Sequence, residues 1–151
     1  MKIMKNRIVL VAMASLLAGS GAAMADSTRI DLDKLQYDVV HDVARRGVLA
    51  VDSQGRPLSF LLRIGKGQFL PPHGAGGGIR LLTVVSGTLS WGDGNKVDPA
   101  AERSFGPGSV IVVPAQGGEH WAVARKDDVL LQIVLVGEGA LTPSVAAQVP
   151  Q

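Results

Sequence analysis

Two histidines are the residues of this sequence best suited to chemistry. His73 closes an apolar stretch that begins at Gly67, and His120 follows a second such stretch, 108–114. An imidazole can ligate a transition metal, transfer a proton or hydrogen-bond to a bound molecule. Both stretches are marked by glycine and proline, which is typical of strands joined by tight turns. We expect the two rings to project from neighbouring strands into one pocket.

The elements that would position these histidines are short strands. Apolar, β-branched segments recur along the chain between glycine- and proline-containing turns, a pattern that indicates a β-sandwich or barrel. The expected strands are 47–52, 58–64, 79–85, 88–91, 103–105, 109–113, 120–124 and 129–136. Residues 110–113 and most of 129–136 are apolar at nearly every position. This predicts burial on both faces, by a second sheet or by a dimer partner.

The first 25 residues have the layout of a secretory signal peptide. Three basic residues open it, an apolar run follows at 8–18, and Ala23-Met24-Ala25 supplies small residues for cleavage. The apolar run is too short to span a bilayer comfortably. We therefore expect cleavage before Asp26, no stable membrane anchor afterwards, and a periplasmic or secreted protein.

Cleavage would leave one domain of nearly balanced charge. The chain of 151 residues has 15 basic and 13 acidic residues, but three basic residues lie in the leader, so the remainder carries 12 and 13 and a net charge of −1. No basic stripe remains, which argues against nucleic-acid binding. We expect an arm at 26–45, a barrel domain at 46–140 and a loose tail at 141–151. His41 lies in the arm, and we interpret it as an ordinary surface or arm residue.

The two histidine stretches resemble the paired motifs of the cupin family, whose fold is a double-stranded β-helix, or jelly-roll barrel. The residues that match the first motif are Gly67, His73 and Gly87, and those that match the second are Gly108, Pro114 and His120. One extra residue stands in the loop before His120. The resemblance covers roughly residues 58–139, and it implies an all-β cupin barrel that forms a homodimer.

In the cupin family, three histidines and a glutamate from these motifs hold a divalent transition metal. His73 and His120 match two of the four positions. The other two hold Ala75, which has no donor atom, and Arg80, whose fixed positive charge would repel a divalent cation. The resemblance therefore implies either a weak residual metal site on the two histidines or no metal at all. The sequence establishes no cofactor with certainty.

Arg80 also indicates a different use of the same pocket. A guanidinium that points into a barrel needs a counter-charge, because a buried unpaired cation is unfavourable. A carboxylate or phosphate ligand would supply that charge through a bidentate hydrogen bond, and an acidic side chain of the protein would supply it equally well. Alternatively, the side chain extends to the barrel mouth and keeps its charge in solvent. Two further polar residues near the histidines, Gln68 and Glu119, could help to hold a residual metal or a ligand. The candidate pocket thus comprises Gln68, His73, Arg80, Glu119 and His120.

Three functions are compatible with these observations. The first is an exported cupin-domain protein that binds a small anionic molecule in its barrel, with weak or no metal binding. The second is a metal-dependent enzyme of the oxygenase or isomerase type that the family includes. The third is a structural or interaction role with a vestigial pocket. The sequence leaves open whether the protein is an enzyme, since no Ser-His-Asp order or carboxylate pair stands out.

Overall fold

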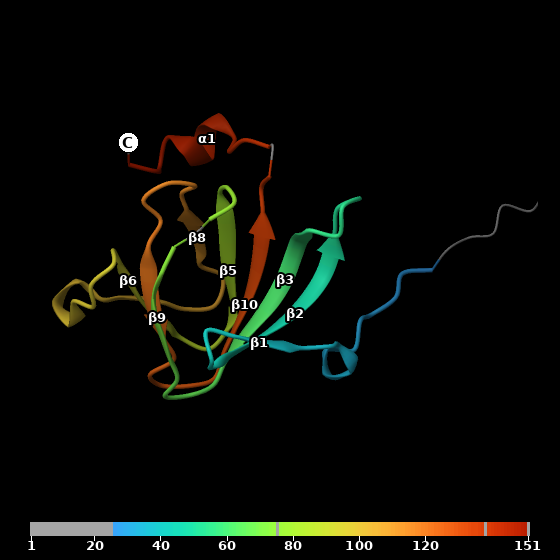
Figure 1. Ribbon diagram of the computed structural model, residues 1–151, viewed down its shortest axis with the longest axis horizontal. Helices are drawn as coiled ribbons and strands as arrows, with labels where there is room; N and C mark the ends of the chain where they lie inside the picture. Colours follow the sequence, from blue (N-terminus) through green and yellow to red (C-terminus); the bar gives the residue numbers. More distant parts are fainter. Residues whose placement is uncertain (1–25, 75, 138, 151) are drawn as a thin grey trace, which may run out of the picture. The chain divides into compact units, whose positions relative to one another are not determined.

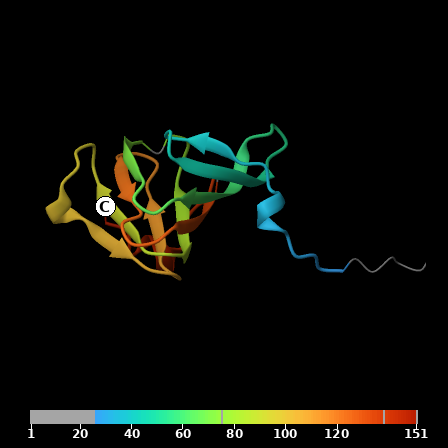
Figure 2. The ribbon, with the colours of Figure 1, turned by 90° about the horizontal axis from the view of Figure 1, so that it is seen from below.

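The computed structural model of the chain describes residues 26–74, 76–137 and 139–150, so the expected signal peptide and Ala75 lie outside the described residues. Residues 26–30 have no regular secondary structure and belong to a unit separate from that of residues 31–150. The second unit is built from two antiparallel sheets (Figures 1 and 2). The all-β fold predicted from the turn pattern is therefore confirmed.

The larger sheet has six strands in the order β1-β2-β3-β10-β5-β8, and the smaller has four in the order β4-β9-β6-β7. The strands are β1 (Asp38–Val40), β2 (Ala44–Val51), β3 (Pro57–Ile64), β4 (Phe69–His73), β5 (Arg80–Ser86), β6 (Leu89–Asp93), β7 (Arg103–Phe105), β8 (Val110–Val113), β9 (His120–Val123) and β10 (Val129–Leu135). The described residues also form three single turns of helix: η1 (Leu32–Lys34), η2 (Pro99–Ala101) and α1 (Pro143–Ala146). No helix within the described residues is long and apolar enough to cross a membrane.

The core lies between the two sheets. Alternate residues of a strand point to opposite faces, and those that point inward on both sheets form one hydrophobic cluster. Its largest members include Ile64, Leu70, Leu89, Trp91 and Leu131, each at most 2% exposed.

The outer face of the larger sheet remains open. On β8 and β10 the inward residues are buried, but Val110 is 60% exposed and Val134 is 39% exposed. The expected burial of both faces is therefore not achieved by a second sheet within the part of the chain that the structure describes.

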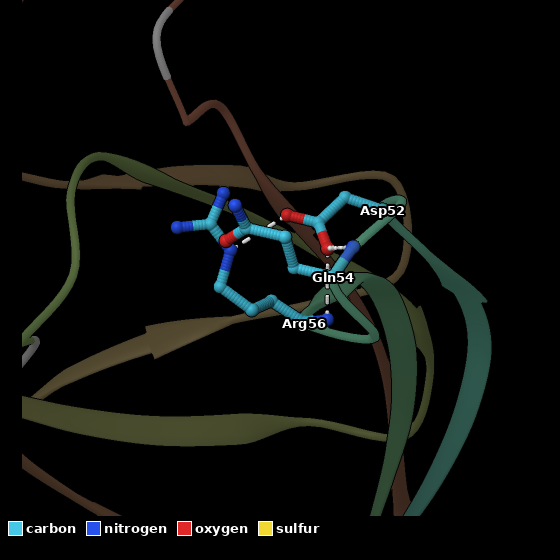
Figure 3. Close-up of polar contacts among 3 residues, drawn as sticks. All are labelled: Asp52, Gln54 and Arg56. Carbon is cyan, nitrogen blue, oxygen red and sulfur yellow. Dashed lines mark hydrogen bonds and ion pairs between the residues drawn. The ribbon is translucent and has the colours of Figure 1, made fainter.

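The turn between β2 and β3 is organised by one carboxylate. Asp52 Oδ1 accepts hydrogen bonds from the backbone N–H groups of Gln54 and Arg56, at 2.8 and 2.9 Å, and Oδ2 accepts from Arg56 Nε at 2.6 Å (Figure 3). These bonds, led by the Arg56 backbone N–H, lower the pKa of the Asp52 carboxyl. Gly55 completes the turn with a φ of 77°, which glycine adopts without strain. This anchor holds β2 and β3 in register at one end of the sheet.

Candidate functional site

A cavity of about 310 Å³ lies between the two sheets. Most of its wall is apolar, and its polar side chains come from five strands or turns. The polar residues that line it are His41, Arg46, His73, Arg80 and His120. Three of the five residues predicted from the sequence, His73, Arg80 and His120, are therefore brought together in one cavity.

His73 and His120 are register partners on the antiparallel strands β4 and β9. Their ring centroids lie 4.3 Å apart, with the ring planes at 64°. The extra residue in the loop before His120 therefore does not move this side chain out of the cavity.

The same backbone contact orients both rings. His73 Nδ1 lies 2.8 Å from the Pro71 carbonyl oxygen, and His120 Nδ1 lies 2.7 Å from that of Gly118. A carbonyl only accepts hydrogen bonds, so Nδ1 carries the proton in each neutral ring. Each Nε2 is therefore left with a free lone pair.

His120 is the most deeply placed of the imidazoles. It is 5% exposed and stacks on Trp91, with ring centroids 4.1 Å apart and planes at 14°. Trp91 is itself oriented by a hydrogen bond from its Nε1 to Asp93 Oδ1, 2.8 Å long. Burial lowers the pKa of His120 to about 4, and it also lowers that of the half-buried His73. Both rings are therefore neutral at pH 7.

His41 belongs to the site, which corrects its interpretation as an ordinary surface or arm residue. It is exposed, but its ring centroid lies 4.0 Å from that of His73 and it lines the cavity. His41 and Asp42 form the turn between β1 and β2 with φ values of 52° and 61°. This left-handed pair is typical of a type I′ hairpin turn, and it presents His41 to His73. This position was not evident from the residues, because the turn lacks the usual Asn-Gly signal.

Arg80 faces the cavity from the start of β5. It is half-buried, and its Nη2 donates a hydrogen bond of 2.7 Å to the carbonyl oxygen of Gly76. Its Nε is buried without a hydrogen-bond partner. Burial lowers the pKa of the guanidinium, and no carboxylate among the described residues forms an ion pair with it.

Arg46, the other arginine of the cavity, is already paired. Its Nη2 and Nε donate to the two carboxylate oxygens of Asp38, at 2.5 and 3.2 Å. Among the described residues that line the cavity, Arg80 is therefore the arginine whose charge is left uncompensated.

Two residues predicted for the pocket lie elsewhere. Gln68 sits in the turn before β4, where its Oε1 accepts a 2.7 Å hydrogen bond from the Gly65 N–H, so its side chain caps the turn instead of reaching the cavity. Glu119 is exposed and comes one position before His120, so strand alternation turns it to the other face. Trp121 alternates in the same way and packs beneath Gly92, outside the cavity.

No protein-family model matches the chain, and no curated protein matches its sequence. Solved structures do match. KdgF from Halomonas sp. is 18% identical with a TM-score of 0.53, over 72% of this chain and 91% of that one. A cupin 2 conserved barrel domain protein from Salinispora arenicola CNS-205 is 16% identical with a TM-score of 0.51, over 74% and 87%. The chain therefore shares the β-barrel fold of these cupin structures. A sugar phosphate isomerase of the cupin superfamily from Silicibacter pomeroyi DSS-3 is 22% identical with a TM-score of 0.52, over 71% and 74%.

The donor set of the cavity does not fit a resident metal. No group of three or more histidine, cysteine, aspartate or glutamate side chains within the described ranges is arranged to hold one. His41, His73 and His120 pack ring against ring instead of converging on one point. In addition, Arg80 supplies a cation at the cavity wall, and its charge would repel a divalent metal ion.

Proposed function

We propose that this cupin is an exported protein that binds a small anionic molecule in its barrel, with weak or no metal binding. The observation that supports the proposal is that the charge and one donor of Arg80 have no partner among the described residues. Its guanidinium faces the cavity, its Nε is buried without a hydrogen-bond partner, and none of the described residues lining the cavity is acidic. A carboxylate or phosphate group would satisfy both the charge and the open donor.

Arg80 is also well held for such a contact. The hydrogen bond from Nη2 to the Gly76 carbonyl fixes one side of the guanidinium, which reduces the side-chain entropy lost on binding. None of the described residues that line the cavity supplies a carboxylate that would compete for Arg80, and Asp38, which pairs with the lining residue Arg46, is already engaged. Export is proposed from the signal-peptide layout of the first 25 residues.

Replacing Arg80 tests the proposal. We expect Arg80→Gln to weaken the binding of acetate, citrate or inorganic phosphate at least about tenfold, because a charge-assisted hydrogen bond contributes roughly 1.5–3 kcal/mol. Calorimetric titration and the ligand-induced rise in melting temperature would measure this. Arg45→Gln, on the outer face of β2, is the matched control and should bind like the wild type. Equal affinities of the wild type and Arg80→Gln for every anion would refute the proposal.

The second candidate is a metal-dependent enzyme, and one observation favours it. His73 and His120 each direct Nδ1–H to a backbone carbonyl and leave Nε2 free, as metal-ligating histidines do. Native mass spectrometry of the protein purified from its export compartment separates the candidates, since it reports metal and retained small molecules together. We expect a retained anion and metal well below one ion per chain. Stoichiometric metal would favour the enzyme.

A further inference from the structure

The cavity is polar near solvent and apolar in its depth. His41 is exposed, His73 and Arg80 are half-buried, and His120 is 5% exposed. Beyond these residues the inward positions carry only hydrocarbon. On β5 the next inward residue after Arg80 is Leu82, 5% exposed, and on β9 Ala122 follows His120.

The far wall continues this apolar surface across both sheets. It is formed by side chains of β3, β4 and β10 that are each at most 7% exposed. These residues are Leu62, Ile64, Leu70, Leu131 and Ile133. Trp91 also lines the cavity in its depth. Its one polar group, Nε1–H, already donates a hydrogen bond to Asp93. Beyond His120, the depth of the cavity therefore offers neither donors nor acceptors to a ligand.

We infer that the ligand is an amphipathic carboxylate, with its acid group on Arg80 and an alkyl or aromatic body directed into the barrel. This inference rests on the proposed anion-binding function and adds the nature of the ligand's body. A sugar acid or another polyhydroxylated anion is disfavoured, because its hydroxyls would lose their hydrogen bonds to water against the apolar wall. An apolar body gains free energy from the same wall.

The cavity volume sets the size of that body. One water molecule occupies about 30 Å³ in the liquid, so about 310 Å³ corresponds to about ten non-hydrogen atoms. Octanoate has this number of atoms. A straight-chain acid of about eight carbons therefore matches the volume of the whole cavity.

A chain-length series on the wild-type protein tests the inference. We expect the affinity, measured by calorimetric titration from butanoate to dodecanoate, to rise about fourfold per methylene and to level off or fall near octanoate. Gluconate serves as the polyhydroxylated probe and should bind much more weakly than hexanoate. An affinity independent of chain length, or tighter binding of gluconate, would overturn the amphipathic ligand. If Arg80→Gln bound these acids more weakly than the wild type in that case, the proposed anion binding would still stand. Equal binding by the wild type and Arg80→Gln would refute both the anion binding and the amphipathic ligand.

A matched pair of variants on β10 separates the cavity from the open outer face. Ile133 lines the cavity, whereas the neighbouring Val134 lies on the outer face and is 39% exposed. Ile133→Phe should fill part of the cavity and move the optimum to acids at least one or two carbons shorter. Val134→Phe should leave the optimum unchanged. A shift of the optimum caused by Val134→Phe alone would place the acyl chain on the outer face and contradict the inference. If Ile133→Phe fails to fold, the chain-length series on the wild type still tests the inference.

Discussion

His73 and His120 lie directly opposite each other on β4 and β9, with their ring centroids 4.3 Å apart. This pairing gives the barrel two neutral imidazoles beside one arginine. Because each ring donates Nδ1–H to a backbone carbonyl, Nε2 offers a bound anion a lone pair at pH 7 and becomes a donor only when the ring gains a proton. The protonation state of this pair should therefore affect both stability and binding.

The stability of the protein should fall as the pH is lowered from about 6.5 to about 4. Burial lowers the pKa of His120 to about 4, so the unfolded chain binds a proton in this range that the folded protein does not. The neutral His120 thus contributes up to about 3 kcal/mol to the free energy of unfolding. This contribution is fully present above the pKa of the unfolded chain and is lost as the pH falls. Urea denaturation at several pH values measures it. His120→Gln should show a shallower decline than the wild type, and an identical decline would contradict the assignment.

Anion binding should be accompanied by proton uptake. A carboxylate on Arg80 would stabilise the protonated form of His73, whose pKa in the free protein is lowered by burial. The affinity should therefore rise as the pH falls from about 7 to about 5.5, where a carboxylic acid is still mostly ionised. Titration calorimetry in buffers of different ionisation enthalpy reports the protons taken up. His73→Gln should abolish most of this uptake, and buffer-independent heats in the wild type would rule out the coupling.

The sequence predicted the barrel better than it predicted the site. The strands β5, β8 and β10 were found because runs rich in β-branched residues between turns favour strands, whereas β3 and β7 were located by the glycine- and proline-containing turns beside them. β1 was missed, since three residues that pair only with β2 carry no periodic signal.

In the site, the spacing of two motifs located His73 and His120. His41 could not be found in this way, because it reaches the cavity through a hairpin turn whose left-handed backbone is not evident from the residues His-Asp. Gln68 was wrongly assigned to the pocket because the side chain of a glutamine near a motif can hydrogen-bond within its own turn as readily as to a ligand.

Gly92→Ala should destabilise the protein by about 1–3 kcal/mol through overpacking. A Cβ at Gly92 would lie 2.1 Å from Cε2 of Trp121, which is 1% exposed and has no space into which to move. Gly106→Ala is the control, because a Cβ there meets no atom within 4 Å and its φ is not left-handed. Thermal and urea denaturation measure both variants. Trp121→Leu should recover part of the loss in the Gly92→Ala background, and a Gly92→Ala protein as stable as Gly106→Ala would refute this packing.

We propose that the open outer face of the larger sheet forms a homodimer. Its apolar residues align across three strands, since Val134 pairs with Leu81 and Leu81 with Val112, and the adjacent Val110 is 60% exposed. The neighbouring row of Gln132, Thr83 and Val110 is more polar, but exposed apolar residues grouped on one sheet face are typical of an interaction site. Light scattering coupled to size exclusion should give twice the chain mass for the wild type and a shift toward the monomer for Val110→Glu. Val97→Glu places the same charge at a 47% exposed valine in the loop after β6 and should remain dimeric. A wild-type protein of single-chain mass, or a Val110→Glu dimer of undiminished affinity, would show that this face has another role.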